Sequence, residues 1–177
     1  RENISIFIDE IADKYQRVLD LLKHNQNSGI IYTRTRKEAE NLTEFLQKNK
    51  LKNVDFFHAG LSVKEKHQKQ EKWLKSNQNV LISTNAFGMG IDKENVRFVI
   101  HLSPAPSLEN YYQEIGRAGR DGEKSYAFLL WNEQELLNLD DVFYNQTPSK
   151  SEFLKVISFL YSTFMIAENY MPLNIFE

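Results

Sequence analysis

Short runs of β-branched and aromatic residues alternate along this chain with longer amphipathic stretches. The apolar runs are SIFI near Ile6, GIIYT at 29–33, VDFFH at 54–58, NVLIST at 79–84, RFVIHL at 97–102 and SYAFLL at 125–130. Most of them are separated by helical patterns of about 10 to 15 residues. Alternation of this βαβ kind predicts an α/β fold in which helices cover both faces of a mostly parallel sheet.

Three sites carry the pattern of a helix start. A hydroxyl residue is followed three positions later by glutamate at Thr35–Glu38, Ser62–Glu65 and Ser149–Glu152. In such a capping box the hydroxyl and the carboxylate satisfy backbone N–H groups that the first helical turn leaves unpaired. These starts agree with the alternation.

The end of the chain has a different organisation. NEQELLNLDDVFYNQ looks helical, TPSK at 147–150 interrupts it, and a final helix follows with Phe153, Ile157, Leu160 and Phe164 on one stripe. We therefore expect a main domain over 1–146 and a short helical extension over 147–177. Since the chain starts without methionine and ends in MPLNIFE, we also expect it to be part of a longer protein.

Composition excludes several classes of protein. None of the 177 residues is cysteine and the four histidines are scattered, so we expect no disulfide framework and no metal site. No apolar run approaches the roughly 20 residues that span a bilayer, which predicts a cytoplasmic protein with no membrane partner. The net charge of −2 hides a gradient, because residues 29–75 hold 11 basic against 6 acidic residues and residues 131–177 hold 2 against 7. One face could therefore still meet phosphates.

Two glycine-rich clusters are candidates for function. The first, STNAFGMGIDKENVRFVIH at 83–101, follows a predicted strand, where ligands bind in α/β sheets. Gly88 and Gly90 would allow close approach to the backbone, Asp92 supplies a carboxylate and Thr84 a hydroxyl. Taken alone, this cluster is better explained as a tight connection in which Asp92 caps a turn.

The second cluster is YYQEIGRAGRDG at 111–122, in which Gln113, Arg117 and Arg120 follow at helical spacing and are expected on one side of a helix. Two guanidinium groups there would form an anion site. Arginines also suit the last turn of a helix for dipole reasons, but that alternative does not explain Gly116 and Gly119, which each cost roughly 0.5–1 kcal/mol against alanine in a helix. Because the chain has no G-x-x-x-x-G-K-[ST] phosphate loop, the arginines must serve a nucleotide that is bound elsewhere.

These residues resemble a known family. GIIYTRTRKEAENL, HAGLSVKEKHQKQEKW, STNAFGMGIDKENVRFVIH and YYQEIGRAGRDG look like motifs IV, IVa, V and VI of superfamily two helicases, and the last two are most similar to RecQ DNA helicases. The resemblance covers about residues 1–131 and implies the second RecA-like domain of an ATP-dependent, 3′ to 5′ DNA helicase. In a bacterial cell such a protein would be associated with the nucleoid.

The family resemblance implies roles for individual residues. ATP with Mg²⁺ would bind mainly to a first RecA-like domain, and Arg117 and Arg120 would contact this ATP as arginine fingers. The glycines would let the helix come close to the nucleotide. Gln113 would lie near the γ-phosphate, and Gly90 and Asp92 would contact the nucleotide. Single-stranded or duplex DNA would be held by the residues that match the DNA side of the family: Thr35, Arg36, His58 and Thr84. Lys64, Lys66, Lys69 and Lys72 are either a further DNA track or a solvated helix face.

The sequence departs from the family in two places. Lys66 stands where similar helicases have arginine in motif IVa, and no four-cysteine zinc module follows in this chain. Two alternatives also stay open. One is a non-catalytic nucleic-acid-binding module that has kept the fold. The other is an RNA-directed helicase domain, although the RecQ-like sequence of both clusters favours DNA.

Overall fold

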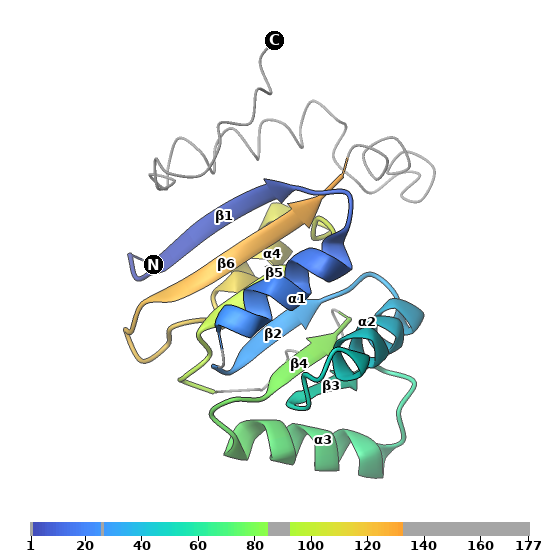
Figure 1. Cartoon of the computed structure of the whole chain (residues 1–177). Coiled ribbons are helices and arrows are strands. Elements are labelled where there is room, and N and C mark those ends of the chain that lie inside the picture. Colours follow the sequence, from blue (N-terminus) through green and yellow to red (C-terminus); the bar gives the residue numbers. More distant parts are fainter. Residues whose placement is uncertain (1, 26, 85–92, 133–177) are drawn as a thin grey trace.

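The computed structural model describes residues 2–25, 27–84 and 93–132 (Figure 1). In chain order, the elements are β1 (Ile4–Glu10), α1 (Lys14–His24), β2 (Gly29–Tyr32), α2 (Arg36–Lys48), β3 (Val54–Phe57), α3 (Val63–Lys75), β4 (Val80–Ser83), β5 (Phe98–His101), α4 (Leu108–Ile115) and β6 (Ser125–Trp131). Every strand expected from the alternation of apolar runs is present, within about two residues of its predicted bounds.

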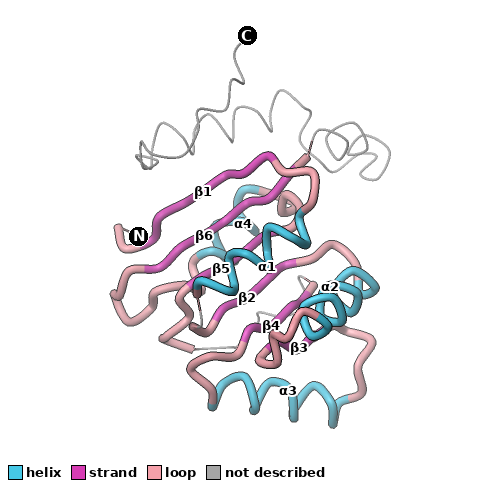
Figure 2. The backbone as a smooth tube through the Cα atoms, viewed as in Figure 1, coloured by secondary structure: helices cyan, strands magenta, loops and turns pink. Residues whose placement is uncertain are grey.

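The strands form one sheet in the order β1-β6-β5-β2-β4-β3, with every neighbouring pair parallel. The first and last strands of the described chain pair with each other, from Ile4 opposite Ser125 to Glu10 opposite Trp131. Figure 2 shows these two strands side by side along one edge of the sheet. Parallel pairing at every step confirms the α/β fold.

Helices cover both faces of the sheet, and a separate apolar core lies under each pair. One core joins α1 and α2 to the sheet through Val18, Leu22, Leu42 and Leu46. The other contains Trp73 of α3 and Tyr111 and Ile115 of α4, packed on alternate residues of the strands. Figure 1 shows α1 and α2 in front of the sheet and α4 behind it. The predicted sandwich of helices around a parallel sheet is therefore confirmed.

The helices begin at the capping residues that the sequence indicates. Ser62 and Glu65 form the complete reciprocal capping box of α3. At α2, the Thr35 hydroxyl accepts a hydrogen bond from the Glu38 N–H at 3.1 Å, while the Glu38 carboxylate accepts one from the Arg34 N–H at 2.8 Å rather than from the cap itself. The third predicted box, at Ser149, lies outside the described residues, as do the boundary near 147 and the helical extension.

None of the helices in the described part of the chain combines the length and apolar character that crossing a bilayer requires.

Candidate functional site

Four of the predicted site residues follow neighbouring strands at the carboxyl edge of the sheet. Thr35 and Arg36 come after β2, Thr84 directly after β4 and His58 directly after β3, and these strands are adjacent in the order β2-β4-β3. Loops at this edge are where parallel sheets bind ligands. The fold therefore gathers residues that are up to 49 positions apart in the chain at one edge.

Arg36 and His58 lie close together around Gly60. A Cβ atom built on Gly60 would lie 3.0 Å from a guanidinium nitrogen of Arg36 and 3.2 Å from Nδ1 of His58. The His58 ring is buried, and its Nε2 lies 2.9 Å from a carboxylate oxygen of Glu40. Its Nδ1 has no hydrogen-bond partner among the described residues. A guanidinium and a buried imidazole nitrogen therefore lie beside the exposed Gly60.

Thr35 and Thr84 differ in their exposure to solvent. Thr35 is exposed at the N-cap of α2, where unpaired backbone N–H groups and the helix dipole favour an anion. Thr84 is only 9% exposed. Thr35 is thus accessible in this structure, whereas Thr84 is largely covered.

The lysines of α3 divide into two kinds. The Lys66 ammonium donates to the Ala59 carbonyl at 2.8 Å, and Lys69 forms an ion pair with Asp55 and lies over the Phe56 ring. Lys64 and Lys72 are exposed. Two of the four lysines are therefore engaged in contacts within the domain.

The expectation that Gln113, Arg117 and Arg120 share one side of a helix is wrong. Helix α4 ends at Ile115, with Gly116 as its C-cap, so both arginines lie in the turns that follow. Gly119 has φ +60°, a left-handed conformation that breaks helical spacing. The arginines are placed by a glycine-directed loop, 116–124, which we call the arginine loop.

The two arginines have different surroundings. Arg120 is exposed, as is Gln113 on α4. Arg117 is half-buried and its guanidinium donates a hydrogen bond to the hydroxyl of Tyr32, the last residue of β2. Burial raises the pKa of Tyr32 well above its ordinary value, so this phenol remains a neutral acceptor for Arg117. Arg117 is thus half-buried and hydrogen-bonded within its own domain, whereas Arg120 is exposed.

Packing within this domain accounts for Gly116 and Gly119 of the arginine loop. A Cβ atom on Gly119 would lie 2.4 Å from the Asn3 side chain and 2.8 Å from that of Ser125. On Gly116 it would lie 2.9 Å from the Tyr112 carbonyl. Neighbouring protein atoms therefore explain these two glycines, and the expectation that they let a nucleotide approach stays a prediction.

Sequence reasoning missed a buried polar group beside Arg117. Nε2 of His101, at the end of β5, lies 2.7 Å from a carboxylate oxygen of Glu114 on α4, and the His101 ring stacks on Tyr32 at 5.1 Å. A cavity of about 190 Å³ opens here, lined by these three residues together with Arg34 and the 103–106 turn. The sequence offers only two signals for this pair. Glu114 lies inside the second glycine cluster, and His101 lies at the end of a predicted strand.

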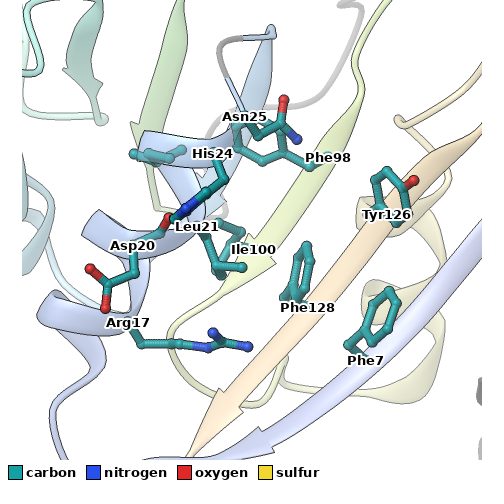
Figure 3. Close-up of a pocket in the computed structure, with 11 residues that line it drawn as sticks. Phe7, Arg17, Asp20, Leu21, His24, Asn25, Phe98, Ile100, Tyr126 and Phe128 are labelled. Carbon is teal, nitrogen blue, oxygen red and sulfur yellow. The ribbon is translucent and has the colours of Figure 1, made fainter. Parts of the chain in front are cut away.

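A larger groove of about 450 Å³ lies on the other face of the sheet, between α1 and strands β1, β5 and β6. Figure 3 shows Phe7, Tyr126 and Phe128 along one side of it and Arg17 and Asp20 of α1 along the other. Phe7 stacks on Phe128 with the ring centroids 5.1 Å apart. None of the predicted site residues that the structure describes lines this groove, so it is separate from the candidate site.

Two predicted nucleotide contacts, Gly90 and Asp92, lie outside the described residues. Within the described ranges, no group of three or more histidine, cysteine, aspartate or glutamate side chains is arranged to hold a metal ion.

Residues 13–122 match the family described as the helicase conserved C-terminal domain. The chain is 39% identical over 138 residues to the ATP-dependent DNA helicase RecQ of Bacillus subtilis, 34% over 166 residues to its probable ATP-dependent DNA helicase RecS, and 46% over 142 residues to the RecQ-like DNA helicase blm-1 of Caenorhabditis elegans. These alignments cover 77%, 92% and 78% of the chain but only 23%, 34% and 14% of the three relatives.

Solved structures share the fold. The second domain of the DEAD-box helicase Mss116p, bound to an RNA duplex, superimposes with a TM-score of 0.67 at 19% identity, covering 89% of this chain and 69% of that one. Saccharomyces cerevisiae Dbp5, bound to RNA and ADP BeF3, gives 0.66 at 22% identity over 91% and 45% of the two chains. The sheet and its helices are therefore those of a second RecA-like helicase domain. The chain belongs to the helicase conserved C-terminal domain family, and it is a domain of the RecQ type.

Proposed function

We propose that this chain is the C-terminal motor domain of an ATP-dependent DNA helicase that moves 3′ to 5′. Its partner would be a first RecA-like domain of the same protein, which would hold ATP and Mg²⁺. Support comes first from the activity that the names of the relatives state, ATP-dependent DNA helicase. In addition, this chain has an exposed arginine, Arg120, in its second glycine cluster but no phosphate-loop motif of its own. By itself the chain would neither hydrolyse ATP nor unwind DNA.

The observation that carries the proposal is that the two arginines differ in burial and in their contacts. Arg117 is half-buried and hydrogen-bonded to Tyr32, while Arg120 is an exposed residue of the same loop. An exposed guanidinium on a braced loop suits a finger that stabilises the charge on a γ-phosphate presented by another domain. Arg117 would support the loop and approach the same phosphate, and exposed Gln113 would help to orient it. Gly90 and Asp92 would contact the nucleotide from the 83–101 segment.

DNA would be held at the carboxyl edge of the sheet. Thr35 with the N-terminus of α2, Arg36 and His58 form a cluster with hydrogen-bond donors and positive charge. Thr84 directly follows β4, which lies between β2 and β3 in the sheet. Such groups match the phosphates of a single strand. Closing of the two domains on ATP and opening after hydrolysis would then pass the strand along.

The finger is tested by DNA-stimulated ATP turnover of the full-length protein carrying Arg120→Ala. We expect turnover to fall roughly 10³-fold or more with nucleotide binding largely retained. Arg17→Ala is the matched control, because Arg17 pairs with Asp9 beside the groove, away from the arginine loop. Turnover of Arg120→Ala within a few-fold of wild type would refute the finger and favour a non-catalytic nucleic-acid-binding module.

The DNA grip is tested with Arg36→Ala, for which we expect weaker binding of single-stranded DNA and a shallower dependence of log affinity on log salt concentration. Lys48→Ala removes a cation from the opposite end of α2 and should change neither. Equal effects of both variants would show a diffuse electrostatic contribution instead of a site.

An RNA-directed activity is the second candidate, because a mimivirus protein named as a putative ATP-dependent RNA helicase is 42% identical over 115 residues. Comparing stimulation of ATP turnover by single-stranded DNA and by RNA of equal length distinguishes the two. Stronger stimulation by RNA would replace DNA as the proposed substrate.

A further inference from the structure

The side chain of Asn3 is hydrogen-bonded to two residues of the arginine loop. Its Nδ2 atom donates hydrogen bonds to the carbonyl oxygen of Gly119 at 2.8 Å and to that of Glu123 at 2.9 Å. Both acceptors are carbonyls, so the amide must present its nitrogen here. These two carbonyls lie on either side of Arg120. Asn3 therefore connects the residues that flank the exposed arginine, although it is 116 positions away from Gly119 in the chain.

Asn3 is itself placed by the sheet. It directly precedes β1, and its carbonyl accepts a hydrogen bond from the Ser125 N–H at 2.9 Å where β6 begins. The Asn3 side chain fits because Gly119 has no Cβ, since a Cβ atom there would approach the Asn3 amide to 2.4 Å. The left-handed glycine and the asparagine thus form a matched pair.

Further contacts fix the loop on its other side. The Gly119 N–H donates to the Val96 carbonyl at 2.9 Å, and Asp121 forms an ion pair with Arg97, just before β5. The loop is consequently fastened to the starts of β1 and β5 at the positions around Arg120. Fastening the neighbours of a side chain limits where its charged end can travel.

We propose that Asn3 is a positioning residue for Arg120. This inference rests on the proposed function, in which Arg120 acts on a nucleotide held by another domain. Asn3 touches no substrate. It acts through the backbone of Gly119 and Glu123, which sets the direction in which Arg120 leaves the domain. A displacement of about 1 Å at a group that contacts a transition state can cost roughly 10²-fold in rate.

The test is a double-mutant cycle in the full-length protein, with Asn3→Asp and Arg120→Ala alone and together. Asn3→Asp keeps the shape of the side chain but replaces both N–H donors with acceptor oxygens that face two carbonyls. We expect Asn3→Asp to lower kcat for DNA-stimulated ATP turnover about 10-fold to 100-fold, with KM for ATP changed less than about twofold. In the Arg120→Ala background the same change should cost less than about twofold, because the group that it positions is gone.

Asn49→Asp is the matched control, since the Asn49 side chain also donates to a carbonyl, that of Phe45 at 2.8 Å, at the far end of α2. It should leave kcat within about twofold of wild type. Hydrogen exchange of residues 116–124 gives an independent readout and should accelerate in Asn3→Asp only. Asn3→Ala, which removes the donors without adding charge, goes through the same cycle in case the aspartate prevents folding.

The outcomes separate the two proposals. If Arg120→Ala leaves turnover unchanged, the proposed function fails, and the role of Asn3 fails with it. If Arg120→Ala abolishes turnover but Asn3→Asp and Asn3→Ala behave like wild type, or their losses add fully to that of Arg120→Ala, the positioning role alone is overturned.

Discussion

Nε2 of His101 lies 2.7 Å from a carboxylate oxygen of Glu114, and this buried contact joins the end of β5 to α4. The His101 ring is 1% exposed, stacks on Tyr32 at 5.1 Å and packs against Tyr111 at 4.9 Å. Arg117 of the arginine loop is hydrogen-bonded to the same Tyr32. The His101–Glu114 pair therefore lies next to the residue that holds Arg117.

Glu114→Ala should destabilise the domain by about 1.5–3 kcal/mol, because it leaves a buried imidazole without its charged hydrogen-bond partner. Glu109→Ala is the control, since Glu109 is exposed on the same helix and accepts a hydrogen bond from the exposed Gln113 at 3.3 Å. Urea unfolding curves of both variants measure the difference. A loss in Glu114→Ala no larger than that in Glu109→Ala would show that the buried pair contributes nothing net.

Gly119→Ala and Gly122→Ala form a second comparison within the arginine loop. Both glycines have positive φ, at +60° and +85°, so each substitution carries a backbone cost of about 1–2 kcal/mol. Only at Gly119 would the new methyl group also meet neighbours, the Asn3 and Ser125 side chains, whereas nothing lies within 4 Å at Gly122. Thermal unfolding should therefore show Gly119→Ala to be less stable by roughly a further 1–3 kcal/mol. Equal midpoints would mean that Asn3 can move aside freely.

Lys93→Met tests the attachment between α3 and the start of the 93–97 segment. The Lys93 ammonium is buried and donates to the carbonyls of Trp73, Leu74 and Ser76 at 3.0, 3.1 and 2.6 Å, which closes the C-terminus of α3. Burial lowers the pKa of Lys93, so part of the benefit is offset by desolvation. A net loss of about 1–3 kcal/mol in the free energy of unfolding is expected in chemical denaturation. An unchanged or increased stability would show that desolvation outweighs the three hydrogen bonds.

Asp121→Asn should reveal a contribution that depends on pH. The hydrogen bond from Arg97 holds the pKa of Asp121 below its usual 3.8, so the folded state binds the proton less readily than the unfolded state does. The stabilisation is therefore complete above pH 3.8 and is lost as the pH falls through the lower folded value. For this largely solvated pair we expect about 0.2–1 kcal/mol between wild type and variant at both pH 7 and pH 5, shrinking towards pH 3. A gap that already differs between pH 7 and pH 5 would assign the effect to another group.

The strands and the covering helices could be predicted from this sequence because their signals are local. Apolar runs such as GIIYT and NVLIST are buried on both faces, and Thr35 and Ser62 begin helices where their hydroxyls can cap. The grouping of Thr35, Arg36, His58 and Thr84 at one edge follows from parallel strands alone. Local pattern and tertiary packing agree at all of these positions.

The arginine loop could not be predicted from spacing because a single left-handed residue, Gly119, overrides it. Helix α4 has already ended at Gly116, and the left-handed Gly119 then packs against Asn3 and Ser125, which no local pattern connects to it. The roles of Tyr32, His101 and Glu114 were missed for the same reason, since each depends on contacts between separate elements. Chemistry-bearing residues were therefore easier to identify than the neighbours that hold them.

The pairing of β1 with β6 also has a consequence for synthesis of the protein. Among the described strands β1 is made first, but its partner β6 is made last, and β6 separates β1 from the rest of the sheet. Pairing between such distant segments is slow to nucleate. Until then β1 offers an unsatisfied edge, and Asn3 cannot close the loop around Arg120. In a nascent chain, the hydrogen bonds of Asn3 on either side of Arg120 can therefore form only after β6 has been made.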